Sequence, residues 1–290
     1  MKLLIEQLTK EFGDKKVLNQ IDLELTTGVY GILGANGSGK TTLMRILASV
    51  MKPTSGRVLL DGEDIAVLKE QYRDLIGYLP QQVGLYKSFK AEKFLLYIAS
   101  LKGIAKEEAK VKVAEVLELV GLGEYKKEKI GKFSGGMKRR IGIAQALLND
   151  PVILIVDEPT AGLDPKERIR FRNLLSQISS NRIVLLSTHI VSDIEYIAKE
   201  VLILKEGQLV KKETPQKLLH GLKQKVWSLV VQQEEVLSFQ RNYRVSNIIR
   251  LEEGVHMRII HEGKPHSRAK EETPNLEDLY LYYFDEEESG

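Results

Sequence analysis

The chain has 290 residues, 43% hydrophobic and 29% charged, a composition ordinary for a soluble globular protein. It contains no cysteine, which excludes a disulfide framework and thiolate chemistry. The formal net charge of +3 is too diffuse to indicate nucleic-acid binding. The aliphatic run at 152–156 is far shorter than the roughly 18 residues of a membrane span.

Charge is distributed unevenly along the chain. Residues 223–290 carry 9 Lys+Arg and 13 Asp+Glu, a net charge of −4, whereas residues 1–222 carry 34 and 27, a net charge of +7. This shift predicts a boundary near 222, between a large domain (1–222) and a small one (223–290). Glu6 interrupts the apolar N-terminus too early for a signal peptide, so we expect a cytoplasmic protein that reaches a membrane only through a partner.

The N-terminal third contains a phosphate-binding pattern. Strands are predicted at 1–8 and 21–25, with Phe12 between them in a lysine-rich turn, as either a satellite core residue or a stacking partner for a nucleotide base. An apolar run at 29–33 then leads into residues 34–42, GANGSGKTT, which fit G-x-x-x-x-G-K-[ST]. A helical pattern follows, which completes the strand–loop–helix context that the motif requires.

The chemistry of phosphate explains this loop. Glycines let successive N–H groups point at one phosphate chain, and the helix start adds positive partial charge. Lys40 is expected to reach the β- and γ-phosphates, and the Thr41 hydroxyl to hold Mg²⁺. The alternative is a flexible Gly/Ser turn before an ordinary helix. The nucleotide contacts predicted in the loop are Gly34, Asn36, Gly37, Ser38, Gly39, Lys40, Thr41 and Thr42.

The middle of the chain alternates between strands and a helical insertion. Strands are predicted at 57–61 and 76–79, and Gln81 follows the second, where an α/β sheet presents groups to a ligand. Residues from about 84 to 150 are predicted to be helical. One helix, 106–120, has apolar residues at helical spacing and stops at Gly121.

A second helix start lies in this insertion, at Ser134-Gly135-Gly136, before a predicted helix at 141–148. Ser134 suits an ordinary N-cap, and the glycines ease the turn. The alternative is a second anion site that acts on another chain.

The run at 152–156 has the composition of a central parallel strand with both faces covered. It ends in Asp157 and Glu158, two carboxylates that are costly at a buried strand end unless they have a function. Asp157 is placed to hold Mg²⁺, and Glu158 to polarise an attacking water. The alternative is a solvated acidic loop. Asp164 is predicted to cap the next helix, with Glu167 completing a capping box.

The remaining elements complete an α/β domain and a small α+β domain. A strand at 182–187 ends at Thr188 and His189, and a helix at 190–198 and a hairpin at 200–210 follow. A helix at 215–220 leads into the acidic tail. The tail elements predicted are strands at 227–231, 244–251 and 254–260 and helices at 234–241 and 275–284.

Together these segments resemble the ATP-binding subunit of an ABC transporter over about residues 1–220. The matching motifs are the Walker A loop at 34–42, the Q-loop Gln81, the signature at 133–137, the Walker B strand at 152–157 with Glu158, the D-loop at 161–164 and the H-loop His189. The resemblance implies a P-loop NTPase fold of the ABC type and ATP as the nucleotide. It assigns catalysis to Glu158, His189 and Gln81, Mg²⁺ binding to Thr41, Gln81 and Asp157, and adenine stacking to Phe12.

The signature departs from the family pattern LSGGQ, with Phe133 for Leu and Met137 for Gln. Ser134 and both glycines remain, so the part that contacts phosphate is intact. The form SGGMKRR and the tail at 276–280 resemble bacterial ATPases that drive export of drugs, antibiotics or peptides.

The resemblance also implies partners. In a head-to-tail dimer, homomeric or heteromeric, ATP at Lys40 of one subunit would be covered by Ser134, Gly135 and Gly136 of the other. The resemblance also counts Asp164, in the D-loop, among the nucleotide-binding residues. Separate membrane subunits, contacted through residues 81–97 and the helical insertion, would hold the protein at the inner face of the cell membrane and choose the substrate. The alternatives are an importer ATPase and a soluble ABC ATPase acting on ribosomes or DNA. The tail suits dimer contact or regulation.

Overall fold

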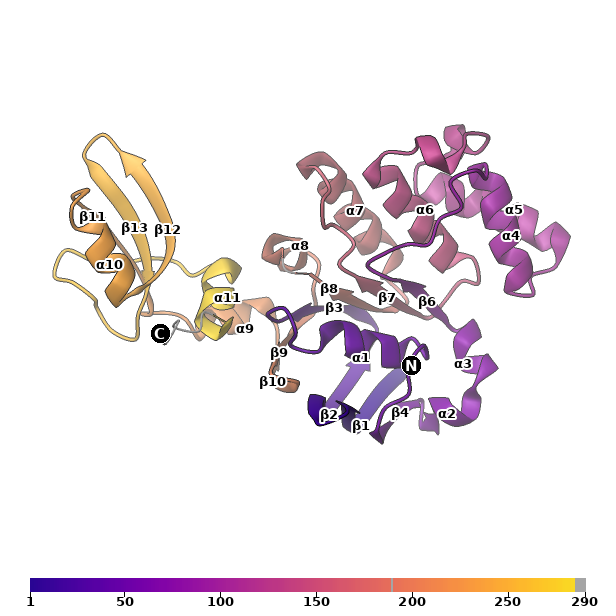
Figure 1. The fold of residues 1–290 in the computed structure, drawn as a ribbon, viewed down its shortest axis with the longest axis horizontal. Helices are drawn as coiled ribbons and strands as arrows, with labels where there is room; N and C mark the ends of the chain where they lie inside the picture. Colours follow the sequence, from indigo (N-terminus) through magenta and orange to yellow (C-terminus); the bar gives the residue numbers. More distant parts are fainter. Residues whose placement is uncertain (189, 285–290) are drawn as a thin grey trace. The chain divides into compact units, whose positions relative to one another are not determined.

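The structure is a computed structural model that describes residues 1–188 and 190–284. The chain forms two compact units, Met1–Lys211 and Lys212–Gly290 (Figure 1). The charge shift predicted a boundary near 222, so the observed division lies earlier in the chain. Helix α9 (Pro215–His220) packs against α11 (Leu276–Phe284), which places it in the second unit.

A six-stranded sheet forms the centre of the first unit, in the order β10-β9-β3-β8-β7-β6. Strands β9, β3, β8, β7 and β6 run parallel to one another. Every residue of β7 and β8 is buried, because helices cover both faces of the sheet. The strands are β3 (Gly28–Leu33), β6 (Ile76–Leu79), β7 (Ile153–Asp157), β8 (Ile183–Ser187), β9 (Glu200–Lys205) and β10 (Gln208–Glu213).

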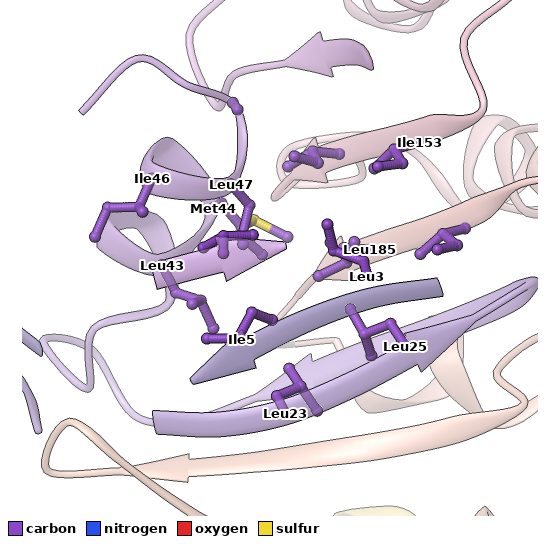
Figure 2. Packing of buried hydrophobic residues seen from close by; sticks show 14 of the residues in the cluster. Leu3, Ile5, Leu23, Leu25, Leu43, Met44, Ile46, Leu47, Ile153 and Leu185 are labelled. Atoms are coloured by element: carbon purple, nitrogen blue, oxygen red, sulfur yellow. The ribbon is translucent and has the colours of Figure 1, made fainter. Parts of the chain in front are cut away.

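A second sheet, antiparallel and in the order β2-β1-β4-β5, packs on helix α1 (Lys40–Leu47). Figure 2 shows side chains of α1 between residues of the two sheets, such as Ile5 of β1 and Leu185 of β8. This packing fixes the helix that follows the phosphate loop. The strands are β1 (Lys2–Phe12), β2 (Lys15–Thr26), β4 (Ser55–Leu60) and β5 (Glu63–Asp64).

Strand β1 is longer than predicted and ends at Phe12, which pairs with Lys15 of β2. Gly13 takes a positive φ of 56° in the tight turn between them. Phe12 was predicted in a turn but is the last residue of a strand, because pairing with β2 extends β1 beyond its apolar part.

Helices fill the chain between β6 and β7, as predicted. They are α4 (Ala91–Leu101), α5 (Lys106–Leu119) and α6 (Gly135–Leu147), with short 3₁₀ turns at Gly123–Tyr125 and Ile130–Lys132. Two short helices, α2 (Ile65–Leu68) and α3 (Glu70–Asp74), precede β6. After β7 come α7 (Pro165–Ile178) and α8 (Val191–Glu195), which is shorter than the helix predicted at 190–198. None of the described helices has the length and apolarity needed to cross a membrane.

The second unit is a four-stranded antiparallel sheet, in the order β12-β13-β11-β14, with helices packed on it. Its core includes Leu229, Met257 and Ile259, with Phe239 of α10 packed against them. The predicted α+β class of this unit is confirmed. The elements are β11 (Val226–Val231), α10 (Val236–Asn242), β12 (Arg244–Leu251), β13 (Gly254–Ile260), β14 (Lys270–Glu271) and α11.

Candidate active site

The site lies at the carboxyl ends of the parallel strands, the edge where α/β sheets bind ligands. The phosphate loop follows β3, the segment with Gln81 follows β6, and Glu158 follows β7. These segments surround a cavity of about 370 Å³. The residues that line it are Phe12, Lys15, Val17, Asn36, Gly37, Ser38, Gly39, Lys40, Thr41, Thr42, Gln81 and Glu158.

The backbone of the phosphate loop requires glycine. Gly37 and Gly39 have φ values of 82° and 103°, a left-handed backbone that residues with a Cβ atom rarely adopt. At Gly39 an added Cβ would lie 2.8 Å from the Val17 carbonyl oxygen, whereas Gly37 has open space around it. The loop therefore exposes its backbone to the cavity.

Lys40 and Ser38 supply the polar groups of this loop. The Lys40 ammonium donates to the carbonyl oxygens of Gly34 (2.6 Å) and Ala35 (3.0 Å). Burial lowers the pKa of Lys40, although Glu158 and Asp157 act in the opposite direction. The buried Ser38 hydroxyl has no hydrogen-bond partner within the described part of the chain. A phosphate chain would satisfy both groups, so these residues fit a nucleotide.

Asp157 ends β7 with a carboxylate that is 1% exposed. Its Oδ1 accepts from the Ser187 hydroxyl at 2.6 Å and lies 3.5 Å from the Thr41 hydroxyl. Its Oδ2 is buried and has no hydrogen-bond partner among residues 1–188 and 190–284. A buried carboxylate oxygen without a donor, beside a threonine hydroxyl, fits a Mg²⁺ site.

Glu158 adopts a left-handed backbone with φ 47°, rare for a residue with a side chain. Its N–H donates to the carbonyl oxygen and the hydroxyl of Ser187, at 3.2 and 3.0 Å. Ser187 thus holds both acidic residues, a role that sequence reasoning missed. The signal was its place at the end of β8, where it pairs with Asp157.

Phe12, at the end of β1, and Gln81, after β6, both line the cavity. Phe12 is 48% exposed, so it is not the satellite core residue of the alternative interpretation. The backbone oxygen of Gln81 accepts a hydrogen bond from Arg139 of α6 at 2.6 Å. Lys15 and Val17, also in the lining, had no recognisable motif in the sequence.

The second helix start does not line this cavity. Ser134 caps α6 by accepting from the Met137 N–H at 3.2 Å, and Ser134 and Gly135 are exposed. Gly136 is buried, and an added Cβ there would overlap the carboxylate of Glu167. The phosphate loop and this glycine pair therefore do not form one site within a single chain.

Asp164 caps α7, because its Oδ1 accepts from the Glu167 N–H at 2.9 Å. The capping box predicted for Glu167 is wrong in its second half. The Glu167 carboxylate pairs instead with Arg140 (3.3 Å) and Arg170 (2.9 Å). Asp164 does not line the cavity. His189, predicted as catalytic, lies outside the described residues.

Comparison with known proteins places this geometry in a family. The family described as ABC transporter matches residues 18–161. An uncharacterised ABC transporter ATP-binding protein, YxlF of Bacillus subtilis (strain 168), is 34% identical over 96% of this chain and 98% of its own length. This chain is an ABC transporter ATP-binding protein.

Other relatives match a smaller share of this ABC ATPase. The bacitracin transport ATP-binding protein BcrA of Bacillus licheniformis is 41% identical over 70% of this chain and 66% of BcrA. Nod factor export ATP-binding protein I of Burkholderia orbicola (strain AU 1054) is 34% identical over 73% of this chain and 70% of that protein.

Solved structures agree with the fold and the reaction. One is a dimeric structure of the ATP-binding cassette MJ0796, in a post-hydrolysis state bound to ADP and Pi. It matches this chain with a TM-score of 0.66 and 27% identity, and the match covers 73% of this chain and 98% of the MJ0796 chain. The predicted ABC fold and ATPase activity are thereby confirmed. The protein binds and hydrolyses ATP.

Proposed function

We propose that this ABC ATPase binds Mg-ATP in the 370 Å³ cavity, hydrolyses it with Glu158 and powers export through separate membrane subunits. The observation that carries the proposal is the meeting of three groups at one sheet edge: the phosphate loop, Glu158, and the Asp157 Oδ2, which has no hydrogen-bond partner among the residues that the structure describes.

Each residue in the cavity has a specific part in this proposal. Lys40 and the loop N–H groups bind the phosphates, and Phe12 stacks on the adenine. Glu158 accepts a hydrogen bond from the attacking water and polarises it. Thr41, Gln81 and Asp157 would hold Mg²⁺, directly or through water, and the ion would offset charge on the phosphates. His189 stays a predicted catalytic residue.

A dimer is supported by the helix start at Ser134–Gly136, which exposes Ser134 and Gly135 and lies outside the chain's own cavity. Its N–H groups and positive helix end suit a phosphate of a nucleotide bound to a second ATPase subunit. We propose a head-to-tail arrangement, with Asp164 at the same interface. The dimeric cassette MJ0796 supports association of two such domains. Either a homodimer or a heterodimer fits this arrangement.

The membrane partner is expected to bind near the loop after Gln81. Three half-exposed aromatic residues gather there, Tyr86, Phe89 and Tyr97, with ring centroids 5.3 to 5.9 Å apart. Such a cluster suits an apolar segment of another chain. This contact would hold the protein at the inner face of the cell membrane.

Export is supported by the relative named for Nod factor export and by the resemblance of the signature region. Nothing in the site favours the importer alternative or a soluble ATPase acting on ribosomes or DNA. The second unit matches YxlF along its length, and we propose that it serves dimer contact or regulation.

A pull-down tests the proposal. Glu158→Gln protein, trapped with Mg-ATP, is captured from detergent-solubilised membranes of its source. We expect a multi-span membrane protein to co-purify, and not to do so with a Lys40→Ala variant that cannot hold the nucleotide. Recovery of ribosomal or DNA-bound partners, with no membrane protein, would overturn the transport function.

A further inference from the structure

Helix α6, which begins with the signature residues, runs beside the loop that carries Gln81. At Gly142 an added Cβ would lie 2.7 Å from Leu79, the last residue of β6, and 3.3 Å from Val83. The helix thus contacts residues on both sides of Gln81. A side chain at this position would require Leu79 or Val83 to shift, so the loop and the helix are packed closely together.

Arg139 lies three residues before Gly142, on the same side of the helix. Its Nη1 donates to the carbonyl oxygen of Gln81 at 2.6 Å, within the range of a short charge-assisted hydrogen bond. The side chain is half-buried, so water competes weakly for this bond. Arg139 therefore fixes the main chain from which the Gln81 side chain extends.

Arg139 also lies within electrostatic range of the acidic end of β7. Burial lowers the pKa of its guanidinium, while the charges of Asp157 and Glu158 oppose that shift. The same two carboxylates act on the Lys40 ammonium from the phosphate loop. Two cations from different elements thus interact with these adjacent carboxylates. When nucleotide binds, Lys40 is expected to contact the phosphates. Arg139 belongs to the signature helix and is not expected to be recruited in this way.

We propose that Arg139 is a positioning residue that holds the Gln81 loop on the signature helix, so that a subunit's Mg²⁺ site forms only with that helix in place. The inference rests on the proposed roles of Gln81 in Mg²⁺ binding and of Ser134–Gly136 in a second subunit's site. In each chain, the Arg139 guanidinium would thus connect the Mg²⁺ site to the helix start that serves the second subunit.

The test compares Arg139→Gln with Lys138→Gln, the neighbouring cation, for which no side-chain hydrogen bond or ion pair occurs in the described part of the chain. We expect Arg139→Gln to lower kcat about tenfold or more and to raise the Mg²⁺ concentration for half-maximal activity about tenfold, from loss of one charge-assisted bond. KM for ATP and nucleotide affinity should change less than about threefold, because the phosphate loop is untouched. Lys138→Gln should behave as wild type.

A purely structural role would lower the melting temperature, but the protein that stays folded would show the wild-type Mg²⁺ requirement for hydrolysis. That result would overturn the inference. If Arg139→Gln does not fold, Arg139→Lys replaces it, since an ammonium keeps the charge but not the planar guanidinium. Arg139→Lys should still raise the Mg²⁺ requirement, and an unchanged requirement would also overturn the inference.

A double-mutant cycle isolates the route of action. If Arg139 acts through the Gln81 loop, Arg139→Gln should add little to the loss caused by Gln81→Ala. Additive losses would overturn the inference. Normal hydrolysis by Glu158→Gln would instead contradict the proposed function, so the two failures are distinguishable.

Discussion

Each unit buries a carboxylate, but the two carboxylates have opposite surroundings. Asp157 in the first unit is 1% exposed, and its Oδ2 has no partner among the described residues. Asp278 in the second unit is 0% exposed, and both of its oxygens are occupied. It accepts from Arg258 Nη2 at 2.7 Å, from the Ser246 hydroxyl at 2.9 Å and from the Asn275 N–H at 2.9 Å.

The difference separates function from stability. Burying a charge costs little free energy only when its hydrogen bonds are complete, as at Asp278. Asp157 keeps an unused acceptor, and the next residue, Glu158, keeps a strained backbone with φ 47°. Such unfavourable features are retained at functional sites, where a bound ligand can supply the missing interactions. The predictions below contrast the two units in order of their expected effect on ATP hydrolysis.

The largest effect is expected for Glu158→Gln. It should bind ATP normally but hydrolyse it at least about 100-fold more slowly, because an amide cannot polarise the attacking water as a carboxylate does. The exposed Glu115→Gln on α5 is the matched control and should keep the wild-type rate. Phosphate release under saturating Mg-ATP measures both, and near-wild-type turnover by Glu158→Gln would remove this residue from the mechanism.

Lys40→Ala should weaken nucleotide binding by roughly 10- to 100-fold, the value of one charge-assisted phosphate contact. Lys106→Ala, at the exposed start of α5, controls for the loss of a surface lysine. Titration with a fluorescent ATP analogue compares them. Equal affinities for the two variants would mean that the loop does not hold phosphate.

Ser134→Arg should leave ATP binding to the monomer unchanged and prevent ATP-dependent dimerisation, since the bulky side chain would occupy the surface offered to a second subunit. Ser176→Arg, exposed on α7, is the control. Light scattering with Mg-ATP, in a Glu158→Gln background, measures dimer mass. A dimer that forms in spite of Ser134→Arg would make this residue a helix cap only.

Asp278→Asn should have the smallest effect on hydrolysis, within about twofold of wild type, because every residue that lines the cavity lies in the first unit. Its effect on stability should be large. The second unit should lose about 3 kcal/mol or more of unfolding free energy, because Arg258 loses its buried partner at 2.7 Å and keeps only the more exposed Glu272 at 3.6 Å. Urea unfolding, with the exposed Glu277→Gln as control, measures this loss.

Local features of the fold could be predicted from the sequence. The strand at 76–79 agrees with β6, and the helix predicted at 106–120 differs from α5 by one residue at its end. In both, the pattern of apolar residues lies within the segment itself, and a proline or glycine stop follows it directly. Phe12 was misplaced because its strand ends where pairing with β2 ends, and pairing depends on another segment.

The site was only partly predictable for the same reason. Glycine loops and acidic strand ends carry their own signature, so the phosphate loop and Glu158 were identifiable. Ser187 bonds to a residue 30 positions away, and Arg139 to one 58 positions away. Glu167 pairs with Arg140 rather than with its own helix start. No local pattern encodes such contacts, since they arise only when the sheet brings distant strand ends together.

The most direct test measures Asp157→Asn and Asp278→Asn side by side, each for thermal unfolding and for Mg-dependent hydrolysis. The account predicts a crossed result. Asp157→Asn should unfold at or above the wild-type temperature, because it removes a buried charge whose Oδ2 lacks a hydrogen-bond partner in the described part of the chain, and should lose hydrolysis. Asp278→Asn should lose stability and keep hydrolysis. Loss of stability by Asp157→Asn with hydrolysis retained would contradict the account.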